Sequence, residues 1–363
     1  MPVTLKDIAE KTGVSASVVS TVLSGRDNGT FVSEGTRKKV REVAESLHYT
    51  PVRSGRPRGS RRLRKLHTEH FIGIWDPEHS SSSAFLIQNL QFALREYAKA
   101  HGADTEDDFG LRLLTAEDLP RLDVIGLMGM ISLSSALLPR EAAMAGIPSV
   151  MVGETDNAPR EMVQVHLDSA AAGRILGDYL WELGHRRVVL LAPSTTPRVT
   201  RERLAGLKSA WTAQGASDAA VTHLAYDTLK TLEERDQIRW AVGKLFGPDT
   251  SPPARPTALV CQDENCAAVS AQTLAGMGLS VPGAVSLAGF GDTPRLAEAL
   301  TPPLTVIRPP VVQIAQTAIT ALYRLHDVNA EEADPESAAE LETDICLPGR
   351  LVVRASCAAP ASA

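Results

Sequence analysis

Short apolar runs alternate with longer amphipathic segments from Phe71 almost to the end of the chain. The runs have the length of buried strands, and the segments between them have the spacing of helices that cover a sheet. We predict strands at 71–75, 123–130, 148–153, 163–167, 187–192, 257–262, 285–290 and 304–308. Helices are predicted at 84–101, 168–183, 200–214, 228–246, 264–277 and 311–326. This alternation predicts an α/β domain with parallel sheets that are covered on both faces.

The first fifty residues have a different pattern, in which short helical segments are separated by tight breaks. Thr4 and Asp7 form a capping-box-like start, and Gly13 permits a sharp turn after one short helix. Ser15 is well suited to cap a second helix, and Ser33 a third. Two short helices joined by a glycine-containing turn predict a helix-turn-helix. A plain three-helix bundle is the alternative.

Charge separates this head from the rest of the chain. Residues 1–70 carry 14 Lys/Arg against 7 Asp/Glu, whereas the remainder carries 23 against 36. A basic head on an acidic body predicts that the head binds a polyanion and the body does not. Residues 51–70 hold seven basic residues and one acidic residue among Pro and Gly, which is typical of a linker.

The stretch Thr4–Ser24, with the sequence TLKDIAEKTGVSASVVSTVLS, resembles the opening of the lactose repressor (LacI/GalR) family of bacterial regulators. The resemblance continues through LGHRRV at 183–188, RERLAGL at 201–207, VPGAVSLAGFGD at 281–292 and TPPLTVIR at 301–308. It implies a homodimer that binds double-stranded DNA at a roughly two-fold symmetric operator. A small-molecule effector, such as a sugar, is implied to control this binding. The implied fold is a helix-turn-helix head followed by a two-lobed, doubly wound parallel-sheet domain of the periplasmic-binding-protein type I.

We therefore expect four regions along the chain. Residues 1–50 form the DNA-binding head and 51–70 a basic hinge or linker. Residues 71–358 form the ligand-binding and dimerisation domain, and 359–363 a disordered tail. The acidic stretch 328–342 is expected to be a mobile loop. The stretch 102–123 is shorter than the family's, so one strand–helix pair is expected to be abridged.

Several small residues of the head match family positions that meet DNA. Phosphate contacts are implied for Thr4, Leu5, Ser15, Ser20, Ser24, Ser33 and Thr36. Base-reading positions are held by Ala16, Ser17 and Thr21. Thr21 stands where the family usually has Arg, the best reader of guanine, so we expect a non-standard operator. The alternative for each small residue is a capping or solvent-facing role alone.

The linker departs from the family's short hinge helix. Residues 54–59 read Ser-Gly-Arg-Pro-Arg-Gly, which looks like the core of an AT-hook. Arginine favours the narrow A·T minor groove because the negative potential is enhanced there. We hypothesise that Arg56 and Arg58 enter the minor groove between the half-sites. A basic tether that makes only phosphate contacts is the equally weighted alternative.

Doubly wound sheets bind ligands at the carboxyl ends of their strands, so the residues just past each strand are candidates. With the resemblance, they give a ligand site of Trp75, Asp76, Phe85, Arg203, Gln262, Asp263, Gly291 and Asp292. Arg203 matches the family arginine that grips ligand hydroxyls or a carboxylate, whereas Gly291 stands where the family has an acid. Other roles stay open: an ion pair for Arg203, helix caps for Asp263 and Asp292, and core packing for Trp75. The ligand therefore differs from the usual sugar, or the domain has lost its sensing role.

No constellation predicts an enzyme, since the chain has no Walker loop, GxSxG, HExxH or suitable Cys/His pair. The four cysteines include no CxxC pair, so we expect neither a metal nor a cofactor. The charged opening residues and the absence of an apolar run of about 18 residues predict a cytoplasmic protein without a membrane segment. The leading function is a ligand-modulated DNA-binding regulator, with repression favoured. The alternative is a DNA-binding regulator whose body only dimerises; a transport solute-binding protein is disfavoured by the head.

Overall fold

The computed structural model divides the chain into two compact units, Met1–Leu66 and His67–Ala363. It describes residues 5–15, 18–19, 22, 33–46, 70–77, 81–101, 109–122, 126–133, 142, 145–159, 162–194, 197–227, 232–251, 255–292, 296–328 and 342–360. The predicted linker up to 69, the stretch 329–341 and the last three residues lie outside these ranges.

The first unit has a small helical core. Helix α1 (Leu5–Thr12) and helix α3 (Glu34–Ser46) pack around Ile8, Val19, Val22 and Val40. Gly13 has a positive φ of 73°, which a glycine adopts without strain, so α1 ends in a tight turn. The predicted helical pattern of the head is thus present in the part of it that is described.

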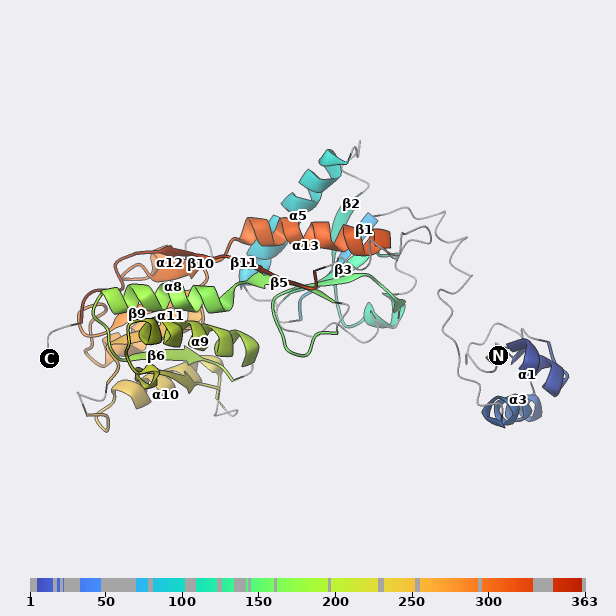
Figure 1. The fold of residues 1–363 in the computed structure, drawn as a ribbon, viewed down its shortest axis with the longest axis horizontal. Coiled ribbons are helices and arrows are strands. Elements are labelled where there is room, and N and C mark those ends of the chain that lie inside the picture. The colour runs from blue at the N-terminus through green and yellow to red at the C-terminus, as the bar shows by residue number, and fades with distance from the viewer. Residues whose placement is uncertain are drawn as a thin grey trace. The chain divides into compact units, whose positions relative to one another are not determined.

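The second unit contains two lobes, each built on a six-stranded sheet (Figure 1). The sheet of lobe 1 has the order β11-β5-β4-β3-β1-β2, and all its pairings are parallel. Its strands are β1 (His70–Trp75), β2 (Phe109–Leu114), β3 (Gly129–Leu133), β4 (Ser149–Val152), β5 (Val163–Leu167) and β11 (Asp344–Leu347). Helices α5 (Ser81–Ala100) and α13 (Val311–Val328) lie together over this sheet, and a short 3-10 helix η2 spans Leu119–Arg121.

The sheet of lobe 2 has the order β12-β10-β9-β8-β6-β7. Its strands are β6 (Val188–Ala192), β7 (Val221–Ala225), β8 (Ala258–Cys261), β9 (Ser286–Phe290), β10 (Thr305–Arg308) and β12 (Arg350–Val352). Only the β10–β12 pairing among them is antiparallel. Its helices are α8 (Ser169–Glu182), α9 (Pro197–Ala213), α10 (Glu234–Phe246), α11 (Glu264–Gly276) and the short α12 (Leu296–Ala299), with 3-10 helix η3 at Asp218–Ala220.

Alternate residues of the lobe 2 strands point to opposite helical layers. Val188 and Leu190 join the core beneath α8 and α9, whereas Val189 and Leu191 join the core beneath α10 and α11. Because both faces of the sheet are buried, its central strands read as continuous apolar runs, as the sequence pattern indicated.

The chain crosses between the lobes three times. It passes from β5 to α8, from β10 to α13, and from β11 to β12. The crossings after β5 and β10 leave the carboxyl ends of strands, so those ends of both sheets lie on the side where the lobes meet. This is the edge at which doubly wound folds bind ligands.

The structure corrects several predicted elements. The strand predicted at 123–130 lies instead at Gly129–Leu133, because Gly126 has a φ of 74° and turns the chain before it. Helix α10 begins at Glu234 rather than 228, and β1 begins at His70, inside the predicted linker. In the stretch 102–123, the strand β2 is followed by the three-residue 3-10 helix η2, which agrees with the abridged strand–helix pair that was expected. Strands β7, β11 and β12 were not predicted.

Candidate functional site

Two serines cap helices in the head. The Ser15 hydroxyl accepts a hydrogen bond from the backbone N–H of Val18 at 3.3 Å, which starts the second helix. The Ser33 hydroxyl accepts one from the N–H of Thr36, also at 3.3 Å, and contacts the Thr36 hydroxyl at 2.8 Å. Both predicted caps are confirmed.

The capping role does not by itself assign a DNA contact to these residues. Leu5 begins α1, and Ser15, Ser33 and Thr36 lie at the start of the second and third helices. The other DNA-contact predictions lie outside the described residues: Thr4, Ala16, Ser17, Ser20, Thr21, Ser24, Arg56 and Arg58.

Arg203 lies in lobe 2 at the edge where the strands of its sheet have their carboxyl ends. Its Nη1 donates a hydrogen bond to the backbone carbonyl of Gln262 at 2.8 Å, and its guanidinium lies 4.0 Å from the centroid of the Phe290 ring. Burial lowers the pKa of Arg203 to about 10, although the charges of Glu154 and Asp263 favour its protonated form. The guanidinium therefore stays positive at neutral pH and spans the ends of β8 and β9.

Close helix packing fixes the position of Arg203. A side chain at Gly173 on α8 would overlap the backbone carbonyl of Arg203, and one at Gly206 would lie 2.7 Å from the backbone nitrogen of Arg174. Glycine at both positions lets the backbones of α8 and α9 approach, so α9 carries its polar side chains on a rigid support.

Two further predicted residues of lobe 2, Asp263 and Asp292, have partners within the protein. The Asp263 side chain caps α11 by accepting from the N–H of Cys266 at 2.8 Å. Asp292 is held by Arg354, with both oxygens 3.0 Å from one guanidinium nitrogen, and by a further short ion pair with Arg308. These contacts are the capping role foreseen for Asp263 and an ion-pair role for Asp292 that the sequence did not indicate.

In lobe 1, Trp75 ends β1 and packs against a small core that includes Leu114 and Met130. Asp76 follows it and is buried. Phe85 lies in the first turns of α5, partly exposed, and its carbonyl accepts a hydrogen bond from Asn89 at 2.8 Å. Trp75 therefore has the core contact that was the alternative to ligand binding.

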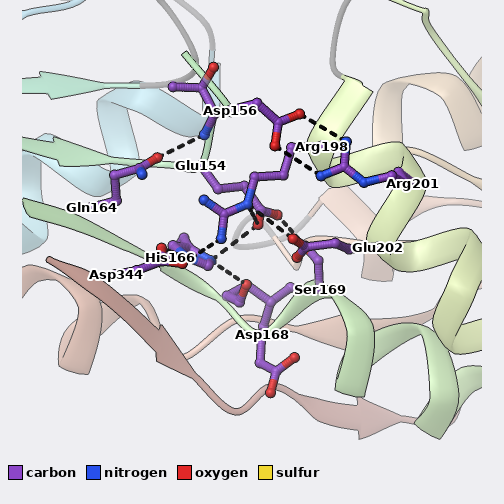
Figure 2. Close-up of polar contacts among 12 residues, drawn as sticks. Glu154, Asp156, Gln164, His166, Asp168, Ser169, Arg198, Arg201, Glu202 and Asp344 are labelled. Carbon is purple, nitrogen blue, oxygen red and sulfur yellow. Dashed lines mark hydrogen bonds and ion pairs between the residues drawn. The ribbon is translucent and has the colours of Figure 1, made fainter. Parts of the chain in front are cut away.

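A polar cluster that the sequence analysis missed lies between the lobes (Figure 2). Glu154 follows β4, and its side chain is only 3% exposed. It accepts a hydrogen bond from the Ser169 hydroxyl at 2.5 Å and lies 3.3 Å from Nδ1 of His166. His166 in turn contacts Asp344 through Nε2 at 2.8 Å. Burial raises the pKa of Glu154, which the Ser169 hydrogen bond and the His166 charge partly oppose.

Two arginines of α9 reach from lobe 2 into this cluster (Figure 2). Arg198 contacts Asp344 at 2.7 Å, Glu202 at 3.0 Å and Glu154 at 3.5 Å. Arg201 makes two hydrogen bonds with Asp156, at 2.8 and 2.9 Å. We call these contacts of Arg198 and Arg201 with lobe 1 the interlobe latch.

The charged forms of the latch residues favour one another. Hydrogen bonds from Arg201 lower the pKa of Asp156. Burial alone would raise the pKa of Asp344, but the hydrogen bonds from Arg198 and His166 outweigh it, so its pKa is lowered. Burial opposes the charge on Arg198 as well, and its carboxylate partners still raise its pKa. Opposite charges therefore join the lobes in this arrangement.

The described residues assemble no group of three or more His, Cys, Asp and Glu side chains placed to hold a metal ion. Within the same ranges no helix has the length and apolar character needed to cross a membrane. What the interlobe edge offers is hydrogen bonding and ion pairing by three guanidinium groups of α9, an amide and several carboxylates.

A signal for the missed residues was present in the sequence. Glu154 stands just past an apolar run, as Asp76 and Asp263 do. Arg198, Arg201 and Glu202 have the i, i+3 and i+4 spacing of one helix face. His166 and Asp344 gave none, because 178 positions separate them in the chain.

Comparison with known proteins gives two family matches. Residues 4–52 match the model described as bacterial regulatory proteins, lacI family, and residues 178–357 match a periplasmic binding protein-like domain. The HTH-type transcriptional repressor PurR of Aliivibrio fischeri strain ES114 is 26% identical over 96% of this chain and 99% of its own length. The regulator MalR of Streptomyces coelicolor is 29% identical over 89% of this chain and 90% of its own.

Solved structures share the fold. The regulator CelR in complex with cellobiose matches with a TM-score of 0.62 at 22% identity, over 98% of this chain and 99% of that one. A LacI-family regulator from Enterococcus faecium with bound ribose matches with a TM-score of 0.61 at 20% identity, over 80% of this chain and 99% of that one. The lac repressor dimer bound to operator matches with a TM-score of 0.57 at 22% identity, over 99% of this chain and 100% of that one.

Proposed function

The chain belongs to the LacI family of bacterial regulatory proteins, and from that premise we propose that a small, sugar-like ligand bound between its lobes controls its affinity for operator DNA. The chain is a DNA-binding transcription regulator and not an enzyme. Repression is the direction favoured by the relatives named PurR, which are repressors. We expect it to act in the cytoplasm, where operator DNA is found.

On the DNA side, we propose that two copies of the chain place paired heads on a two-fold symmetric operator, as in the lac repressor dimer bound to operator. The helix that Ser15 caps would enter the major groove, and the serine and threonine hydroxyls near helix starts would contact phosphates. Base reading would fall to Ala16, Ser17 and Thr21.

On the ligand side, the observation that carries the proposal is the convergence of polar groups where the two sheets present their carboxyl ends. Arg203 and Gln262 come from lobe 2, and Glu154 from lobe 1. A ligand that contacts both lobes binds only when they are close together. It therefore shifts the population toward the closed domain, which changes the spacing of the two heads.

The alternative, a body that only dimerises, has one observation in its favour. The interlobe latch joins the lobes through side chains of the protein itself. If the latch already holds the lobes in their DNA-binding arrangement, no effector is needed.

The test has two stages and uses the full chain. A duplex operator is first selected from a randomised library, and its Kd is measured by fluorescence anisotropy at several salt concentrations. The Kd is then measured with D-ribose, cellobiose, maltose and hypoxanthine. We expect salt-sensitive binding and a change of about fivefold or more with one compound. If the protein shows no salt-sensitive DNA binding, the proposal that it is a DNA-binding regulator is refuted. If the operator Kd is unchanged with every compound, the effector-free alternative is favoured.

A further inference from the structure

His166 of β5 lies beside the interlobe latch, with an oxygen atom facing each of its two ring nitrogens. Nδ1 lies 2.9 Å from the backbone carbonyl oxygen of Leu167, and Nε2 lies 2.8 Å from Oδ1 of Asp344. A carbonyl oxygen only accepts hydrogen bonds, and so does an ionised carboxylate. A neutral imidazole has a single N–H, so it donates to one of these oxygens but not to both. Both contacts are hydrogen bonds only when His166 carries two ring protons and a positive charge.

The acids on either side of His166 favour this charged form. Arg198 donates a hydrogen bond to Asp344 at 2.7 Å and the pKa of that carboxyl group is lowered, so Asp344 faces the ring as a carboxylate. On the other side, Oε2 of Glu154 lies 3.3 Å from Nδ1 and accepts no hydrogen bond from the described residues. The side chains of His166 and Glu154 are 4% and 3% exposed, so water does little to screen the attraction between them.

The charge on His166 also affects the balance of charges between the lobes (Figure 2). Arg198 of α9 lies 3.5 Å from Glu154, and it pairs with Glu202 of the same helix at 3.0 Å as well as with Asp344. Among the described residues, two carboxylates of lobe 1 and one of lobe 2 therefore surround one guanidinium group. With His166 charged, two cations face these three carboxylates, and without that charge only one does. Loss of the proton thus leaves an excess of negative charge where the lobes meet.

We propose that the interlobe latch responds to pH: the lobes join with a proton held on His166, and loss of that proton at mildly alkaline pH weakens the contact between them. Histidine suits this role because it is the side chain that ordinarily titrates between about pH 5 and 8. The device needs no bound ligand, so it goes beyond the proposed function and does not depend on it.

The direction of the pH effect depends on which arrangement of the lobes holds the proton more tightly. When the lobes are joined, Arg198 lies against Glu154 and Asp344, and a neutral His166 would face a buried oxygen without a proton between them. When the lobes part, water reaches these groups and hydrates them, so the neutral imidazole costs less. The joined arrangement therefore binds the proton more tightly, and it is favoured as pH falls through neutrality. Asp344 sets the acid limit, because its lowered pKa means that the pairing with Arg198 is lost only as pH falls through that lowered value.

The experiment measures urea unfolding of the full-length protein between about pH 6 and pH 8.5, with tryptophan fluorescence as the signal. His166→Gln supplies an amide that both donates and accepts, as a neutral imidazole does, but that does not titrate. Glu154→Gln keeps the size of the side chain and removes the charge beside Nδ1. His223→Gln is the matched control, because Nε2 of His223 on β7 contacts one carbonyl oxygen, that of Ala192, at 3.1 Å. Circular dichroism reports that each variant is folded.

We expect the unfolding constant of the unaltered protein to rise with pH more steeply than that of His166→Gln, by up to about tenfold per pH unit, the effect of one linked proton. The unaltered protein should be the more stable of the two at the acid end of the range, and their stabilities should converge at the alkaline end. Glu154→Gln should flatten the profile as well, and His223→Gln should leave it unchanged. Parallel profiles for the unaltered protein and a folded His166→Gln, or equal flattening by His223→Gln, would overturn the inference.

A double variant tests whether the proton acts through the contact between the lobes. Arg198→Met removes the cation of lobe 2 and leaves His166 with both of its oxygen partners in lobe 1. If the proton stabilises the latch, His166→Gln should raise the unfolding constant at about pH 6 by a much smaller factor in the Arg198→Met background than in the unaltered protein. The same factor in both backgrounds would show that the proton stabilises lobe 1 alone, and the interlobe role would be refuted.

Discussion

Replacing Arg198 by methionine tests whether the interlobe latch stabilises the domain. Methionine keeps an unbranched apolar stem and removes the charge, so Glu154 and Asp344 lose one cationic partner each. Arg201→Met is the control, since this arginine lies one turn further along α9 and also pairs with a lobe 1 acid.

The two variants differ in burial, and that difference sets the expected magnitudes. The side chains of Arg198 and Glu154 are 14% and 3% exposed, whereas those of Arg201 and Asp156 are 58% and 46% exposed. An exposed ion pair contributes about 0.5 kcal/mol, and breaking a fully buried one costs about 3–5 kcal/mol. Glu154 keeps Ser169 and His166, and Asp344 is half-exposed, so we expect a loss of about 2 kcal/mol for Arg198→Met. For Arg201→Met we expect a loss close to the error of the measurement, because the pair is exposed and solvent screens it.

Urea unfolding followed by tryptophan fluorescence measures the difference. All four tryptophans lie in the second unit, so the signal reports on the two-lobed domain and not on the head. High salt should abolish the effect of Arg201→Met, because exposed charges are screened, and should leave most of the effect of Arg198→Met. Equal losses for the two variants, or a loss below about 0.5 kcal/mol for Arg198→Met, would refute the reasoning from burial.

Four further predictions concern two glycines, one aspartate and the basic linker. Gly206→Ala should lower the free energy of unfolding by about 2 kcal/mol, because the new methyl group forces α8 and α9 apart. In the same urea assay, Gly243→Ala, in a helix position with nothing within 4 Å, should raise it by about 0.5 kcal/mol. The lowered pKa of Asp344 means that its stabilising effect is present above the ordinary aspartate range and is lost as pH falls through the folded value. Asp344→Asn should therefore flatten the acid side of a stability–pH profile, and an unchanged slope would contradict this. Replacing Arg56 and Arg58 together by alanine should weaken binding to an A·T-centred operator more than to a G·C-centred one. It should also reduce the slope of log affinity against log salt concentration by about two. Equal losses of affinity on both operators would support a basic tether that makes only phosphate contacts.

Local patterns were sufficient for the features that depend on neighbouring residues. The caps at Ser15 and Ser33 and the turn at Gly13 each depend on residues no more than about four positions away. The structure has all three where the sequence predicts them. The central strands of both sheets were also predictable, since burial on two faces makes them continuous apolar runs.

The edge strands were not predictable in this way. In β7 and β11 most residues are partly or fully exposed, so the sequence there mixes polar and apolar positions. Their pairing depends on a neighbouring strand, β6 for one and β5 for the other, rather than on a local pattern.

The sequence by itself therefore determined the helix-turn-helix pattern, the alternation of strands and helices, and Arg203 and Gln262 as candidates at strand ends. Only the tertiary structure decided that Asp292 is used in ion pairs and that Glu154 lies against His166 and Arg198. The physical reason is the triple crossing of the chain between lobes. It brings His166 and Asp344 together on neighbouring strands of lobe 1 and lets Arg198 of α9 in lobe 2 reach Glu154 and Asp344, and no spacing along the chain records those contacts.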